Sequence, residues 1–230
     1  MRRNSSTVVV LAGPAPGEVL AAVGRSMNVT LYRPEQHAPE QHRPEQHRPE
    51  QHRPERQGGQ EGDGLAAAAE ALQRAGRASS PYAMVPADPL AAMAASWREM
   101  WDISRPEGPV GPAGFEQEAV KALAAWRAGR FELPDYYLVL AREDTEGPDF
   151  YLGPLRSVRA HRVVLVPETD PGQQAAGVLH ALGSLRHGPW WPGLDEVIEV
   201  ARRFYPDSLA EGAATGSLPV TPEAGRVRAG

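Results

Sequence analysis

The chain has 230 residues, of which 41% are hydrophobic, with no cysteine and a net charge of −5. This length suffices for one domain of ordinary size plus additional segments. The absence of cysteine excludes disulfides, thiol nucleophiles and thiolate metal sites, and it fits a reducing compartment. The acidic excess falls in residues 81–210 and argues against general nucleic-acid binding, which depends on clustered basic residues. No apolar run approaches the roughly 20 residues that span a bilayer, so we expect a cytoplasmic protein with no membrane partner.

Residues 1–32 are predicted to form an amino-terminal β/α segment. Thr7–Leu11 has the pattern of a buried strand, Glu18–Arg25 that of a short helix, and Asn28–Tyr32 that of a second strand. The turn between the first two contains Pro14 and Pro16, which lack the backbone N–H groups that a phosphate-binding loop needs. We therefore interpret the segment as structural, and its relation to the main sheet stays open.

Residues 33–64 form a repetitive linker of the pattern Pro-Glu-Gln-His. Proline recurs at every fifth position and hydrophobic residues are missing, so we predict a disordered coil. Imidazole suits Zn²⁺, Ni²⁺ and Cu²⁺, so metal capture is an alternative role for the repeated histidines, which are His37, His42, His47 and His52. Over metal capture, we favour the interpretation that the repeat is tolerated because it lies in a linker. We assign no metal and no cofactor.

The helices of the remaining chain are predicted from start signals and apolar periodicity. Residues 65–80 are an alanine-rich helix, and residues 81–210 are the folded domain. Asp88-Pro89 and Asp170-Pro171 are typical helix starts, with Asp at the N-cap and Pro at the first helical position. Further helices are expected over 115–128 and 194–205. Residues 211–230 are predicted to be a disordered tail.

The organising feature is the stretch 136–166, which is rich in β-branched and aromatic residues. Its three apolar runs predict an antiparallel meander whose third strand carries Arg159 and His161 on one face. The predicted class is therefore α+β: a small antiparallel three-stranded meander packed with about four helices, with a possible extra amino-terminal strand and a disordered repeat linker.

The segment His187–Gly193 places two adjacent tryptophans between prolines. We expect one tryptophan to fill the core and the other to be exposed. The candidate binding residues are therefore Trp190, Trp191 and His187, together with Arg159 and His161. Two alternatives remain: both tryptophans seal a junction between helices, or the basic strand pairs with the acidic run that begins at Glu143.

No catalytic motif is present, so no catalytic residue and no metal ligand is assigned. The segments Asp149–Val166 and His187–Glu211 resemble a family of small, poorly characterised streptomycete proteins, one of them encoded beside a glucose kinase. This resemblance implies an accessory or regulatory role linked to carbon metabolism, and it transfers no functional residue.

The leading functional prediction is a non-enzymatic cytoplasmic regulatory or protein-interaction protein with an unidentified protein partner. The alternative is a small-molecule-binding or hydrolytic enzyme, with His161, His187 and a carboxylate between the meander and the last two helices. DNA binding by the carboxyl-terminal helix pair is a third possibility, opposed by Asp195 and Glu199 on the outer face. The oligomeric state is left open.

Overall fold

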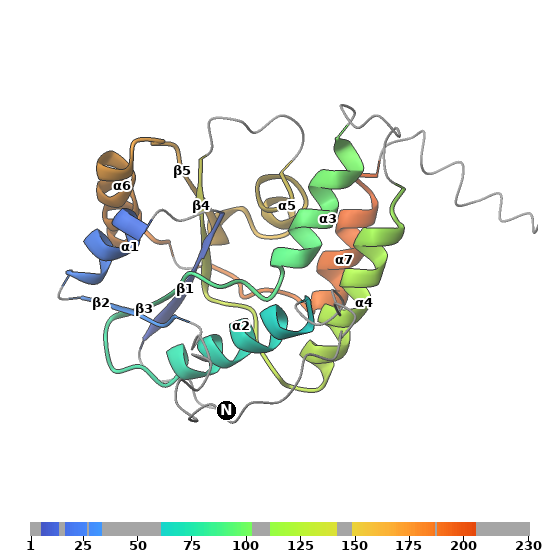
Figure 1. The fold of residues 1–230 in the computed structure, drawn as a ribbon, viewed down its shortest axis with the longest axis horizontal. Helices are drawn as coiled ribbons and strands as arrows, with labels where there is room; N and C mark the ends of the chain where they lie inside the picture. The colour runs from blue at the N-terminus through green and yellow to red at the C-terminus, as the bar shows by residue number, and fades with distance from the viewer. Residues whose placement is uncertain are drawn as a thin grey trace, which may run out of the picture.

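The chain folds around one sheet of five parallel strands in the order β2-β3-β1-β4-β5. This computed structural model describes residues 6–13, 17–26, 28–33, 61–102, 111–141, 149–186 and 188–205. The strands are β1 (Thr7–Ala12), β2 (Val29–Leu31), β3 (Tyr82–Val85), β4 (Tyr136–Leu140) and β5 (Val163–Val166). Helices cover both faces of the sheet (Figure 1), so the class is α/β.

Each face of the sheet has its own set of helices and its own buried core. On one face lie α1 (Gly17–Gly24) and α6 (Pro171–Gly183). On the other lie α2 (Glu61–Ala75), α3 (Ala91–Trp101), α4 (Ala113–Arg127) and α7 (Leu194–Arg202). Figure 1 shows α4 beside α3 and α7, at one end of the molecule. The π-helix η1 (Tyr151–Leu155), α5 (Arg156–Val158) and the 3-10 helix η2 (Ala160–Arg162) connect β4 to β5.

The predicted antiparallel meander is wrong, because β4 and β5 run parallel and a helical crossover joins them. The middle run, expected as a strand, begins instead with the Asp149 carboxylate accepting the backbone N–H groups of Tyr151 and Leu152 at 2.8 and 3.0 Å. These bonds favour helical turns. Every residue of β4 is buried, as in a parallel strand that is covered on both faces.

The amino-terminal elements belong to this sheet, which answers the question that the sequence left open. The predicted strand, helix and second strand are confirmed as β1, α1 and β2. β1 pairs with β3 on one side and β4 on the other, and because it lies at this central position all but its first residue are buried. The strand β3 was not predicted, since Tyr82–Val85 is too short to show a clear periodicity.

The predicted helix start at Asp170 is confirmed, because Asp170 is the N-cap of α6. The predicted N-cap at Asp88 is wrong, because α3 begins at Ala91 with Leu90 as its N-cap, and Asp88 lies in the turn before the helix. Asp88 Oδ1 accepts the N–H of Leu90 at 3.0 Å, and Asp170 Oδ1 accepts that of Gln173 at 3.0 Å. The repeat over 34–60 and the tail from 206 onward lie outside the described residues. Within the described ranges, no helix combines the length and apolar character needed to cross a membrane.

A cluster of aromatic rings joins α3, α4, η1 and the end of α7. Trp97 is fully buried at its centre, with ring centroids 5.4 Å from Phe115 and 6.0 Å from Phe150. At the rim, Glu116 accepts two hydrogen bonds from Arg202 at 2.7 and 2.9 Å, which ties α4 to α7. The sheet is therefore supported from this side by a well-packed helical layer.

Candidate functional site

The direction of the strand connections marks the carboxyl edge beside β1 as the place to look for a site. The chain leaves β1 toward β2 over the face that carries α1, whereas it leaves β3 and β4 in the opposite direction over the other face. In open parallel sheets, ligands bind at the carboxyl ends of strands near such a reversal. The segment Pro86–Asp88 follows directly after β3 at this edge.

Asp88 is held by three hydrogen bonds that come from three separate parts of the chain. Its Oδ2 accepts the hydroxyl of Tyr151 at 2.5 Å, and its Oδ1 accepts the hydroxyl of Tyr137 at 3.4 Å. The N–H of Leu90 completes the set. Tyr137 lies on β4 and Tyr151 on η1, so the carboxylate connects β3, β4 and the π-helix. π-Helices are frequent at functional sites.

The protonation states within this cluster follow from its burial. Desolvation raises the pKa of Asp88 to about 6, although the bonds from Tyr151, Leu90 and Tyr137 oppose the rise. Burial, followed by the nearby Asp88 charge, raises the pKa of Tyr137 and of Tyr151 well above 10. Both phenols therefore remain protonated at neutral pH and donate to the carboxylate, which itself changes charge near pH 6.

We expect Asp88→Asn to stabilise the protein at pH 7 more than at pH 4. The folded state holds the Asp88 proton up to about pH 6, whereas an ordinary carboxyl loses it near 3.8. Ionised Asp88 therefore lowers stability progressively as pH rises from about 4 to 6, by up to about 3 kcal/mol. Urea unfolding of the unaltered protein and of the variant, each at pH 7 and at pH 4, gives the effect of the substitution on the free energy of unfolding at each pH. A difference that is independent of pH would contradict this assignment.

Tyr151→Phe provides a second test of the coupling between Asp88 ionisation and stability. It removes only the hydroxyl that donates to Asp88, and this bond lowers the carboxyl pKa. Without this bond the pKa of Asp88 should rise further. The loss of stability with increasing pH should then extend to a higher pH than in the unaltered protein.

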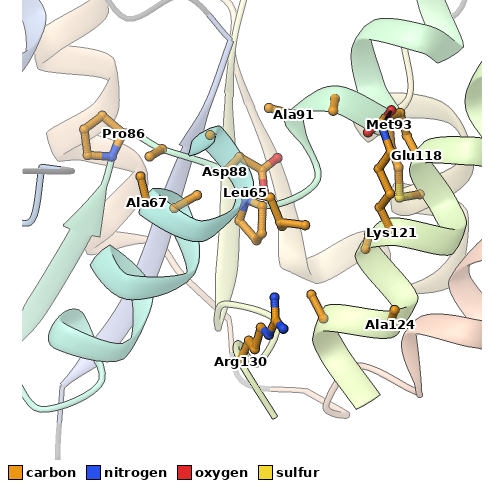
Figure 2. Close-up of a pocket in the computed structure, with 17 residues that line it drawn as sticks. Leu65, Ala67, Pro86, Asp88, Ala91, Met93, Glu118, Lys121, Ala124 and Arg130 are labelled. Atoms are coloured by element: carbon orange, nitrogen blue, oxygen red, sulfur yellow. Dashed lines mark hydrogen bonds and ion pairs between the residues drawn. The ribbon is translucent and has the colours of Figure 1, made fainter. Parts of the chain in front are cut away.

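Next to Asp88 is a cavity of about 840 Å³ between α2, the start of α3 and α4 (Figure 2). Its walls are mostly small or apolar, including Leu65, Ala67, Ala68, Pro86, Pro89, Ala92, Met93, Ala122, Ala124 and Ala125. The charged residues on its lining are Asp88, Glu118, Lys121 and Arg130. The Nζ of Lys121 lies 2.5 Å from Glu118 Oε1, and Arg130, on the loop that follows α4, extends into the space between the helices.

The structure brings four of the five predicted binding residues together elsewhere, at the amino edge of the sheet. Arg159 Nε donates to the Trp190 carbonyl oxygen at 2.8 Å, and His161 Nε2 lies 3.1 Å from the Pro189 carbonyl oxygen. Trp190 is 60% exposed, while Trp191 is partly buried. His187 and the acidic run over 143–146 lie outside the described residues.

The backbone around Arg159 and His161 differs from the predicted strand face. Arg159 is in an irregular conformation and His161 in η2, since β5 begins only at Val163. Their side chains hold the tryptophan loop through its carbonyl groups. In this structure they serve a positioning role on the loop, and whether the surface binds a partner stays a prediction.

The sequence analysis missed the cavity residues for a physical reason. Asp88 was interpreted as a helix N-cap, whereas α3 begins only at Ala91, and its partners Tyr137 and Tyr151 are 49 and 63 residues away. The available signal was an Asp-Pro pair directly after a short apolar run. Only the tertiary structure brings these segments together.

Comparisons with protein families, with curated proteins and with solved structures find no match to this chain. In the described part of the chain, no three His, Asp or Glu side chains are grouped so that they could hold a metal ion.

Proposed function

We propose that this protein binds a small, mostly apolar molecule with one anionic group in the cavity beside Asp88. The observation that carries the proposal is a cavity of about 840 Å³ with apolar walls, into which the Arg130 side chain extends (Figure 2). Small-molecule sites have this size range and this composition, with few polar groups that fix orientation.

The charges on the lining support an anionic group near Arg130. The Lys121 ammonium is paired with Glu118, whereas no described acidic residue bonds the Arg130 guanidinium. A guanidinium binds carboxylate, sulfonate or phosphate oxygens through directed hydrogen bonds. Asp88 lies at another part of the wall, so the ligand would place its apolar body along α2 and α4 and its anion toward Arg130.

The described lining favours binding over a reaction. It contains no histidine, serine or threonine, and its one lysine is engaged by Glu118. We therefore propose a non-enzymatic role, and we keep the cytoplasmic location as part of the proposal, to be tested by cell fractionation. The predicted regulatory role linked to carbon metabolism stays a prediction.

Anilinonaphthalene sulfonate, an apolar aromatic anion, is a suitable probe for the full-length chain. We expect saturable one-to-one binding, measured by fluorescence titration. Arg130→Gln should weaken it by about tenfold, because a charge-assisted hydrogen bond is lost. Ala124→Trp should abolish it, because the new ring occupies the cavity from α4.

Two control variants make this test specific. Arg127→Gln removes an exposed arginine from the end of α4, three residues before Arg130, without changing the lining, and it should leave binding unchanged. Trp190→Ala tests whether the probe binds instead at the exposed tryptophan. Circular dichroism confirms that each variant is folded. Binding that survives both Arg130→Gln and Ala124→Trp would refute the proposed site.

A further inference from the structure

A second hollow, of about 720 Å³, lies at the amino edge of the sheet and is lined mainly by aromatic rings. Its walls include Trp126, Phe131, Trp190, Trp191 and Pro192, and the charged residue on its lining is Glu132. The cavity beside Asp88 shares none of these residues.

Trp190 is exposed yet held in place, which is the main observation. Arg162 is 3% exposed, and its guanidinium lies 4.5 Å from the Trp190 ring centroid and 4.8 Å from that of Tyr136. The guanidinium is thus inserted between the two rings. It also donates to the carbonyl oxygens of Gly188 at 2.8 Å and Pro189 at 3.2 Å. One face of Trp190 is supported from within, while 60% of the residue remains exposed.

The neighbouring rings are also fixed. Trp191 Nε1 donates to the Pro134 carbonyl oxygen at 2.7 Å, and its ring packs edge-on against Tyr137. The end of the Trp126 ring lies against the backbone of Gly193, where an added Cβ would stand 3.4 Å from it. The hollow is therefore preformed, and a ligand would not have to order its walls.

We infer that this hollow binds a neutral carbohydrate, with a pyranose ring stacked on the exposed face of Trp190. A flat pyranose presents an apolar face of C–H groups to an aromatic ring and hydroxyl donors at its edge. The described lining contains no basic side chain, so it offers no charged partner to an anion. The Arg162 charge on the inner face of Trp190 disfavours a second cation on the outer face.

A proline-rich peptide is the competing occupant, because aromatic grooves also bind polyproline segments. Such a peptide offers carbonyl acceptors and needs donors from the groove. The indole N–H of Trp191 is already engaged by Pro134, and the described lining contains no hydroxyl, amide, imidazole or basic side chain that could donate to a peptide carbonyl. These two observations favour a hydroxyl-bearing ligand.

Isothermal titration of the full-length chain with xylohexaose and cellohexaose tests the inference, since both are neutral and present flat sugar faces. We expect saturable binding of at least one of them. Trp190→Ala should weaken this binding by at least about tenfold. Trp190→Phe should retain part of it, because a smaller stacking surface remains.

Arg130→Gln is the control that separates the two sites, and it should leave oligosaccharide binding unchanged. Failure of the sulfonate probe to bind beside Asp88 has no bearing on this result. The inference is overturned if neither sugar binds, if Trp190→Ala binds as well as the unaltered chain, or if a proline-rich decapeptide binds in place of the sugars.

Discussion

Replacing Trp97 with alanine should destabilise the protein by about 3–5 kcal/mol, the range typical of removing a large buried ring. Trp97 is fully buried, and its ring contacts those of Trp101, Phe115, Phe150 and Tyr205. These rings come from α3, α4, the start of η1 and the end of α7. The cavity left behind could not be filled without moving several elements, so the loss is a large fraction of the stability of an ordinary domain.

Trp190→Ala is the matched control for this change. It deletes the same side chain from a position that is 60% exposed, where one face of the ring packs on Arg162. Its cost should be about 1 kcal/mol or less. Urea unfolding followed by far-UV circular dichroism suits both variants, because it does not depend on tryptophan emission. Equal losses for the two variants would show that the aromatic cluster is not the main support of the helical layer.

The second large effect is expected at Arg162, where substitution by methionine should cost about 2–4 kcal/mol. The guanidinium donates to the carbonyl oxygens of Asp135, Pro189 and Gly188, at 3.0, 3.2 and 2.8 Å. Methionine replaces much of the stem but leaves these three carbonyl groups without that donor. Buried polar groups that lose their partner incur the full cost of desolvation.

Two measurements accompany the Arg162 variant. Urea unfolding gives the loss of stability, and limited proteolysis should show faster cleavage within 188–193, because the arginine holds this loop. Arg156→Met is the control, since Arg156 is exposed and surface changes of this kind lie within about 0.5 kcal/mol. An Arg162 variant as stable and as resistant as the Arg156 variant would contradict this account of the loop.

The elements of this protein were more predictable than their arrangement. The strands Thr7–Ala12 and Tyr136–Leu140, and the helices that begin near Asp88 and Asp170, follow from apolar periodicity and from capping residues. These signals are local, because they depend on side chains and backbone groups within a few residues of each other.

The direction of the strands was not predictable in the same way. β4 was correctly placed near 136–140, whereas the strand predicted over 158–166 is confirmed only at its end, as β5, and the two pair in parallel and not as parts of a meander. The segment between them was interpreted as a strand because it is aromatic, whereas Phe150 and Tyr151 are buried against the helical layer in helical turns. Buried aromatic residues occur both in strands and in helical turns, so composition alone did not distinguish these two structures.

The sequence alone thus determined the positions of most strands and helices, the aspartate that caps α6, and the unusual tryptophan loop. The tertiary structure decided the parallel order of the sheet, the central place of β1, and the meeting of Asp88 with Tyr137 and Tyr151. The reason is physical: helix starts and periodicity arise from neighbours in the chain, whereas strand order and buried polar clusters arise from contacts between segments far apart in it.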